Sequence, residues 1–159
     1  IMTKLTVGDR APNFQLPDQS GNLHQLSDYS GRYLLLYFYP RDNTPGCTTQ
    51  ACELRDAWAD FGKLNANVLG ISADSVQSHA KFAAKFALPF PLLADDKREM
   101  LQAYGVLAEK SMFGKKFLGI RRMSFLINRE GKIAKIYEKV KPSEHAVEVL
   151  NDLKKLLTV

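Results

Sequence analysis

The sequence contains little cysteine and no long apolar run, and both shortages limit what the chain can be. Its 159 residues include only two cysteines, Cys47 and Cys52. A chain of this length buries about two-thirds of its unfolded surface, so it needs no disulfide staple or structural metal. No apolar run approaches the roughly 18 residues of a membrane span, and the first residues lack the pattern of a signal peptide. We therefore expect one domain, residues 1–159, in the cytoplasm and not bound to a membrane.

Several motifs of cofactor and hydrolase chemistry are also missing. The sequence has no glycine-rich phosphate loop, no Gly-x-Ser-x-Gly elbow and no Cys-x-x-Cys pair. Its three histidines, His24, His79 and His145, are scattered without the spacing of metal ligands. We therefore expect no metal, haem, flavin or other cofactor. In a cytoplasmic chain, two cysteines are more often redox-active or inert than joined in a structural disulfide.

The positive charge is confined to one part of the chain. The net charge is +5, and residues 107–141 carry ten Lys or Arg against three Asp or Glu. No helix of arginines occurs there, and no aromatic residues alternate with the basic ones as stacking platforms for bases. The distribution favours a solvated loop-and-strand face over a nucleic-acid site.

The apolar pattern predicts an α/β fold. Residues 33–39 are apolar on both faces, as expected of a central strand covered by helices. Before them, short extended pieces at 13–16 and 22–26 flank a turn signal and predict an N-terminal β-hairpin. A helix is expected from Thr44 to about Phe61, because its apolar residues keep helical spacing.

The second half of the chain changes from alternating strands and helices to paired strands. Strands are expected at 67–72, 91–94, 123–127 and 132–137, helices at 75–86, 98–104 and after a cap at Ser143, and a hairpin or loop at 107–121. Such an order indicates a mixed sheet between two helical layers.

Both cysteines lie between Pro40 and Cys52, where the central strand ends and a helix begins. Thr44 followed by Pro45 is typical of an N-cap and a first helical residue. Cys47 then falls in the first turn, among backbone N–H groups without helical partners and at the positive end of the helix dipole. This position favours the thiolate, so Cys47 is a candidate nucleophile, with an inert buried cysteine as the alternative.

The second cysteine cannot reach the first inside an intact helix. Cys47 shares the buried face with Leu54, whereas Cys52 is rotated by about 140° and raised by about 7.5 Å. Their Cα atoms should lie about 8–9 Å apart, beyond the roughly 7 Å limit for a disulfide. We hypothesise that Cys47 becomes a sulfenic acid, the first turns of the helix unwind, and Cys52 attacks to form a disulfide. In the alternative, Cys52 is a bystander.

This segment resembles the active-site signature of the peroxiredoxins, Pro-x-x-x-Thr-x-x-Cys, here at residues 40–47. Residues 44–52, Thr-Pro-Gly-Cys-Thr-Thr-Gln-Ala-Cys, are similar to the peroxiredoxin Q, or bacterioferritin comigratory protein, branch. The likeness extends to Gly-x-x-Ala-Pro-x-Phe at 8–14 and Arg-x-Ser-Phe-Leu-Ile at 122–127. The resemblance implies a thioredoxin-like fold, reduction of hydroperoxides by a thiol, a thioredoxin-like dithiol protein as reductant, and a monomer.

The residue types of the segment suit these roles. Attack on a hydroperoxide builds charge on the departing oxygen, so the site needs a thiolate and hydrogen-bond donors for both oxygens. The Thr44 hydroxyl and the backbone N–H groups of Gly46 and Cys47 can be those donors. By the resemblance, Arg122 is the cation that stabilises the thiolate and the leaving oxygen, and Pro40 shields the sulfur from water.

Each of these residues also has a purely structural interpretation. Thr44 could only cap the helix, Arg122 could be a surface charge, and Pro40 could only end the strand. Gln50, one turn past the nucleophile, matches a polar position of the family but could equally be solvated or structural. Arg121 should point to the opposite face of its strand from Arg122.

Two other functions remain open from the sequence. The chain could be a thiol–disulfide oxidoreductase, although its cysteines would be unusually far apart for that chemistry. It could also be a thioredoxin-fold binding module whose basic face, residues 107–141, contacts nucleic acid. Consumption of peroxide that depends on Cys47 distinguishes a peroxidase from both.

Overall fold

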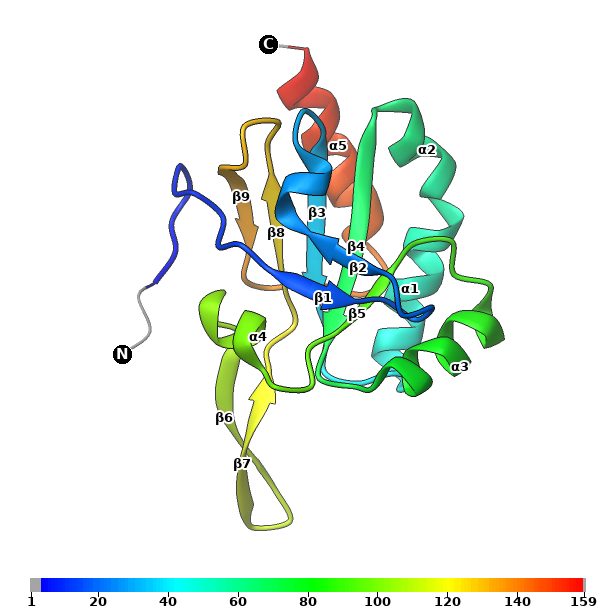
Figure 1. Ribbon diagram of the computed structural model, residues 1–159, viewed down its shortest axis with the longest axis vertical. Helices are drawn as coiled ribbons and strands as arrows, with labels where there is room; N and C mark the ends of the chain where they lie inside the picture. The colour runs from blue at the N-terminus through cyan, green and yellow to red at the C-terminus, as the bar shows by residue number, and fades with distance from the viewer. Residues whose placement is uncertain (1–3, 159) are drawn as a thin grey trace.

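A computed structural model describes residues 4–158, and its centre is a five-stranded mixed sheet (Figure 1). The strands are β1 (Gln15–Pro17), β2 (Leu23–Gln25), β3 (Tyr33–Phe38), β4 (Ala66–Ser72), β5 (Leu92–Ala94), β6 (Leu107–Met112), β7 (Lys115–Ile120), β8 (Met123–Ile127) and β9 (Ile133–Tyr137). The order in the sheet is β5-β4-β3-β8-β9. β3 runs parallel to β4 and antiparallel to β8, so Leu36 lies opposite both Leu69 and Phe125. The mixed sheet predicted from the sequence is confirmed.

Helices cover both faces of this sheet (Figure 1). They are α1 (Pro45–Asp56), α2 (Trp58–Lys63), α3 (Val76–Phe86), α4 (Glu99–Ala103) and α5 (His145–Leu157), with a 3-10 turn at Leu26–Tyr29. Alternate side chains of β3 enter two separate cores, because successive side chains of a strand point to opposite faces. Leu35 and Tyr37 pack with α1, α2, α3 and α5, whereas Leu34 and Leu36 pack with α4 and the N-terminal segment. β3 is therefore buried on both sides, as its apolar sequence predicts.

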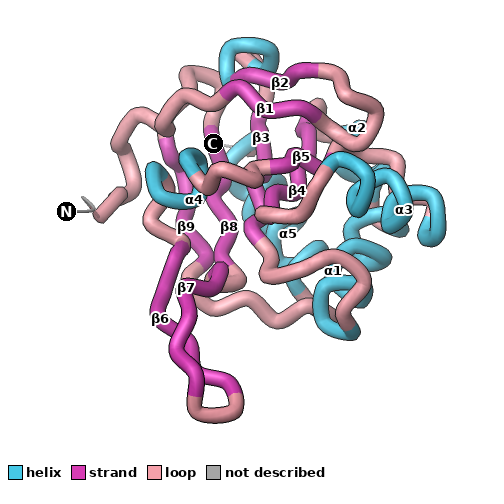
Figure 2. The backbone as a smooth tube through the Cα atoms, turned by 60° about the horizontal axis from the view of Figure 1, so that its bottom comes forward, coloured by secondary structure: helices cyan, strands magenta, loops and turns pink. Residues whose placement is uncertain are grey.

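Two hairpins lie outside the central sheet. β1 pairs with β2, which confirms the N-terminal hairpin. β6 pairs with β7, and Figure 2 shows this hairpin extending away from the body of the molecule. Phe113 at its tip is 97% exposed. The basic segment 107–121 is thus an ordered, projecting hairpin, one of the two forms that the sequence left open.

Two helix boundaries differ from the prediction. The helix expected to reach Phe61 ends at Asp56, because Ala57 leaves helical geometry with φ −92° and ψ 0° before α2 begins. Ser143 is not the cap of the last helix, since Glu144 occupies the N-cap position. There the backbone N–H groups of residues 144 and 145 both donate to the carbonyl of Lys141, at 3.0 Å each, and this turn delays the start of the helix.

None of the helices within residues 4–158 combines the length and the apolar character needed to cross a membrane.

Candidate active site

The N-terminus of α1 forms one side of the site. Thr44 occupies the N-cap and Pro45 the first helical position, as predicted, and the Thr48 N–H donates to the Thr44 carbonyl at 2.8 Å. The Thr44 hydroxyl does not cap the helix, because it donates to the carbonyl of Arg41 at 2.9 Å. The backbone N–H groups of Gly46 and Cys47 precede the first bonded donor of the helix. They are therefore available to a ligand at the helix end.

Arg122 brings a positive charge to the sulfur of Cys47. Cys47 lies in the first turn of α1 and is only 2% exposed. Arg122, between β7 and β8, donates from Nη2 to Cys47 Sγ at 3.3 Å. Its other amino group, Nη1, donates to Gln50 Oε1 at 2.6 Å. The fold thus joins two segments 75 residues apart around one sulfur, and a guanidinium stays charged and can donate to both partners at once.

Gln50 is a buried part of this arrangement. Its side chain has no exposed surface, so the solvated position left open by the sequence is wrong. Its Oε1 holds Arg122, and among the described residues its Nε2 is buried without a hydrogen-bond partner. A buried amide bonded at one end orients its partner more firmly than a surface side chain would. Gln50 therefore fixes the direction in which Arg122 presents its charge.

Gly46 leaves the room that the guanidinium needs. A Cβ atom at this position would lie 3.1 Å from Arg122 Nη2 and 3.8 Å from Pro142 Cγ. The first distance is tighter than ordinary van der Waals contact. Any side chain at position 46 would therefore require the Arg122 guanidinium to shift by a few tenths of an ångström. Nothing in the sequence pointed to Pro142, which lies in the turn before α5.

Arg121 and Pro40 are neighbours of the site residues in the sequence. Arg121 is exposed whereas Arg122 is partly buried, which agrees with opposite faces for the two side chains. The Arg121 backbone N–H donates to the carbonyl of Val106 at 2.7 Å. Pro40 is half-buried at the end of β3 and begins the loop that leads to α1. Its place is suited to shielding the site, and its role stays a prediction.

Cys52 shares the helix of Cys47 but not its face. Both thiols are free, with Cys47 buried and Cys52 half-buried. Because both lie within the continuous helix α1, helical geometry keeps their Cα atoms about 8–9 Å apart. A disulfide between them therefore requires part of α1 to unwind.

Tyr37 is an uncharged residue in the core beside Cys47. It is buried in the core cluster that also contains Cys47. Burial raises the pKa of its phenol well above the usual range, and the negative charge near Asp42 and Cys47 acts in the same direction. Tyr37 therefore stays protonated and brings no competing charge to the sulfur.

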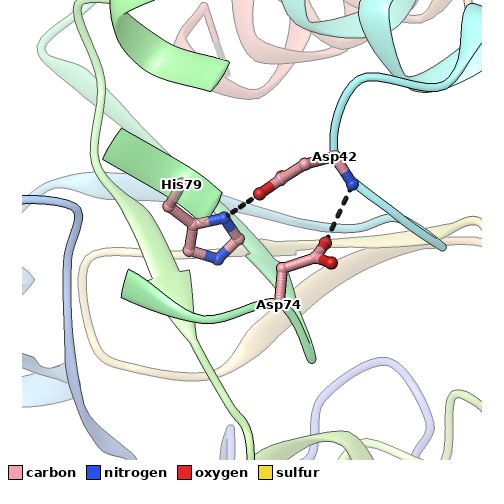
Figure 3. Close-up of side chains that lie close together, drawn as sticks. All are labelled: Asp42, Asp74 and His79. Atoms are coloured by element: carbon pink, nitrogen blue, oxygen red, sulfur yellow. Dashed lines mark hydrogen bonds and ion pairs between the residues drawn. The ribbon is translucent and has the colours of Figure 1, made fainter. Parts of the chain in front are cut away.

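A second polar cluster lies beside the site, and the sequence analysis missed it. Asp42, Asp74 and His79 place ligand-type atoms within 4.8 Å of one another (Figure 3). His79 Nδ1 lies 2.7 Å from Asp42 Oδ2, and the Asp42 backbone N–H donates to Asp74 Oδ2 at 2.8 Å. No local spacing could reveal it, since His79 follows Asp42 by 37 residues. These hydrogen bonds occupy the atoms that a metal would need.

The other two histidines are also paired with carboxylates. His24 Nε2 lies 2.7 Å from Asp18 Oδ2 in the N-terminal hairpin. His145 at the start of α5 lies 3.1 Å from Glu148 Oε1 and 2.8 Å from Ser124 Oγ. Burial lowers the pKa of His145, although Glu148 acts in the opposite direction. The histidines that the sequence left without partners therefore belong to separate histidine–carboxylate pairs.

Comparison with known proteins agrees with this geometry. The sequence model of the AhpC/TSA family matches residues 7–136. The chain is 45% identical to peroxiredoxin Bcp of Bacillus subtilis over 94% of its length and 96% of the relative. It is 46% identical to peroxiredoxin Bcp of Escherichia coli over 96% of its length and 98% of the relative.

The fold also matches that of a solved relative. The crystal structure of a cysteine-to-serine variant of PrxQ from Xylella fastidiosa superimposes with a TM-score of 0.92 at 39% identity, covering 98% of this chain and 99% of that one. This likeness confirms the thioredoxin-like fold. Together these likenesses show that the protein is a thiol peroxidase. The chain belongs to the AhpC/TSA family, on its Bcp and peroxiredoxin Q branch.

Proposed function

We propose that Cys47 is the nucleophile that reduces a hydroperoxide and that Arg122 is its principal catalytic partner. The observation that carries the proposal is the contact of 3.3 Å between Arg122 Nη2 and Cys47 Sγ at the N-terminus of α1. A guanidinium and a helix end together favour a thiolate over a thiol. The same donors can stabilise the charge that develops on the departing oxygen.

The peroxide oxygens have further donors close to the sulfur. The backbone N–H groups of Gly46 and Cys47 lie at the N-terminus of α1, and Thr44 lies three residues, just under one helical turn, before the nucleophile. The Thr44 hydroxyl donates to Arg41 in the resting arrangement and can turn its proton to a bound oxygen. Pro40, half-buried at the start of the loop, limits access of water to the sulfur.

The reaction balances with the two thiols and a reductant. The Cys47 thiolate attacks the terminal oxygen of the hydroperoxide, the O–O bond breaks, and the leaving oxygen takes a proton to depart as water or an alcohol. Part of α1 then unwinds, and the Cys52 sulfur displaces hydroxide from the Cys47 sulfenic acid, which leaves as water with the Cys52 proton. A dithiol protein reduces the resulting disulfide by thiol exchange and becomes oxidised itself.

The substrate class extends to organic hydroperoxides. A solved relative from Xanthomonas campestris, 40% identical over 90% of this chain, is described by its alkyl peroxide reduction activity. The partly buried Arg122 and the backbone donors recognise only the two oxygens, so they accept hydrogen peroxide and alkyl hydroperoxides alike. We propose thioredoxin or a similar dithiol protein as the physiological reductant.

The protein is proposed to act as one domain spanning residues 1–159, as a monomer in the cytoplasm, without a cofactor, a membrane or a nucleic acid as partner. The family match over residues 7–136 supports the single domain. Lys110, Lys115 and Lys116 lie on the two paired strands of the projecting hairpin, which agrees with a solvated basic face.

Peroxide consumption by the wild type and by Cys47→Ser tests this proposal. With thioredoxin, its reductase and NADPH present, the wild type is expected to consume hydrogen peroxide and cumene hydroperoxide, and Cys47→Ser neither. The same preparations are assayed with insulin disulfides and with added RNA. Reduction of insulin without peroxide turnover would instead indicate a dithiol exchanger, and RNA-dependent behaviour a binding module.

A further inference from the structure

Asp42 ties the active-site loop to the rest of the fold. The loop of residues 40–44 connects β3 to α1, and Asp42 within it is only 8% exposed. Its carboxylate accepts from the Tyr39 hydroxyl at 2.6 Å and from Ser78 Oγ at 2.8 Å, and lies 2.7 Å from His79 Nδ1. One loop residue is therefore bonded both to the end of β3 and to the first turn of α3.

The backbone of the same residue is held from a third direction. The Asp42 N–H donates to Asp74 Oδ2 at 2.8 Å (Figure 3). Asp74 is itself fixed, because Ser72 Oγ donates to the same carboxylate oxygen at 2.7 Å. The side chain and the backbone of Asp42 are thus both held by groups outside α1.

A proton joins Asp42 to His79. His79 is fully buried, and its Nε2 lies 2.9 Å from the Leu93 carbonyl, which can only accept. Nε2 must therefore donate, and Nδ1 faces a carboxylate oxygen at 2.7 Å. A proton has to lie between Nδ1 and Oδ2, so the 2.7 Å contact is a hydrogen bond that joins the active-site loop to α3.

The anchoring stops directly after Asp42. Asn43 has a left-handed backbone, φ 59°, and among residues 4–158 its exposed side chain accepts a hydrogen bond from Lys85 Nζ alone, at 3.3 Å. The hydroxyl of Thr44 bonds back to the loop itself, at Arg41. The chain therefore changes from a residue with four hydrogen-bond contacts, two of them fully buried, to a residue with a left-handed backbone and one exposed contact.

We propose that Asp42 and His79 are positioning residues that form the fixed end of the segment that unwinds. The proposal rests on the proposed function, in which α1 must unwind for Cys52 to reach Cys47. While the pair is intact, it holds Thr44 and the first turn of α1 in the arrangement that reacts with peroxide. The unwinding then begins at Asn43 and not farther back in the loop.

This role makes opposite predictions for the two chemical steps. Releasing Asp42 lets the loop and the first turn of α1 leave the reactive arrangement, so oxidation of Cys47 by peroxide slows, and a displacement of about 1 Å is enough for a tenfold or larger loss. The same release favours the unwound state, so formation of the disulfide with Cys52 proceeds as fast as in the wild type or faster. Loss of stability alone would not divide the two steps in this way.

Rapid mixing with hydrogen peroxide measures both steps. The single tryptophan, Trp58, lies just beyond α1 and packs on Phe90 with ring centroids 5.9 Å apart, so its fluorescence can follow the oxidation and the unwinding. Asp42→Ala and His79→Ala are expected to slow the first phase by about tenfold or more and to leave the second unchanged or faster. Acid-quenched samples analysed by intact mass assign the phases to the sulfenic acid and the disulfide.

Two further variants separate the role of the Asp42–His79 contact from an effect on general stability. Asp42→Asn can keep hydrogen bonds to Tyr39 and to a neutral His79, so its first phase should stay within about threefold of the wild type. His24→Asn removes a histidine–aspartate contact of the same 2.7 Å length in the N-terminal hairpin, and neither phase should change.

Equal slowing of both phases, no slowing in Asp42→Ala, or an Asp42→Asn variant as slow as Asp42→Ala would overturn the proposal. Each of these results differs from a failure of the proposed function, which would appear as peroxide consumption by Cys47→Ser.

Discussion

Replacing Arg122 by alanine should slow the reaction of Cys47 with peroxide much more than the same change at its neighbour. The substitution removes the bond of 3.3 Å to Sγ and the bond of 2.6 Å to Gln50 Oε1. A hydrogen bond to a charged group contributes about 1.5–3 kcal/mol, which corresponds to about 10- to 150-fold in rate. Because Arg122 is partly exposed, solvent screens part of this interaction. We therefore expect a loss in the lower half of the range, about 10- to 40-fold.

The assay is the second-order rate constant for oxidation of Cys47 by hydrogen peroxide, measured by rapid mixing without reductant. Arg121→Ala is the matched control, because Arg121 is the adjacent arginine and is exposed. Arg122→Lys should recover only part of the rate, since an ammonium cannot reproduce the two-pronged contact with sulfur and amide. An Arg122→Ala rate within about threefold of the wild type, or an equal loss in Arg121→Ala, would refute the reasoning.

Three further changes test other parts of the account. Gly46→Ala should slow the oxidation of Cys47 by peroxide about tenfold without loss of folding, because its Cβ would crowd Arg122 Nη2 at 3.1 Å. An unchanged rate constant would show that the guanidinium can move aside. The free energy of unfolding should fall as the pH drops below about 6.5, because burial lowers the pKa of His145, so the unfolded chain binds a proton that the folded chain does not. Urea unfolding at pH 7.5 and 5.5 measures this change in free energy, which should be smaller in His145→Gln than in the wild type. An equal change in both proteins would contradict the assignment. One equivalent of peroxide should reduce the helical circular dichroism of the wild type but not of Cys52→Ser, and no loss in the wild type would exclude unwinding of α1.

The sequence predicted the framework because its signals are local. The apolar run of β3 shows a strand buried on both faces, and each hairpin is marked by its own turn residues. The errors fall where the backbone is decided by tertiary contacts. At Ala57 the helical pattern continues in the sequence while the backbone leaves helical geometry and a second helix, α2, begins at Trp58.

The site was predictable only in part, for the same reason. Cys47, Thr44 and Gly46 lie in one segment, and a Thr-Pro pair predicts the helix start that positions them. Arg122 could be assigned only through the family resemblance, since it reaches the sulfur across 75 residues. The Asp42–His79 contact left no trace in the sequence, because the two residues are 37 positions apart, which matches no helical or strand spacing.

The mass of the intact protein after one equivalent of hydrogen peroxide tests the central claim most directly. The account predicts that the wild type loses about 2 mass units through a Cys47–Cys52 disulfide, whereas Cys52→Ser gains one oxygen on Cys47. A wild type that gains oxygen without forming the disulfide, or a Cys47→Ser variant oxidised as readily as the parent, would contradict it.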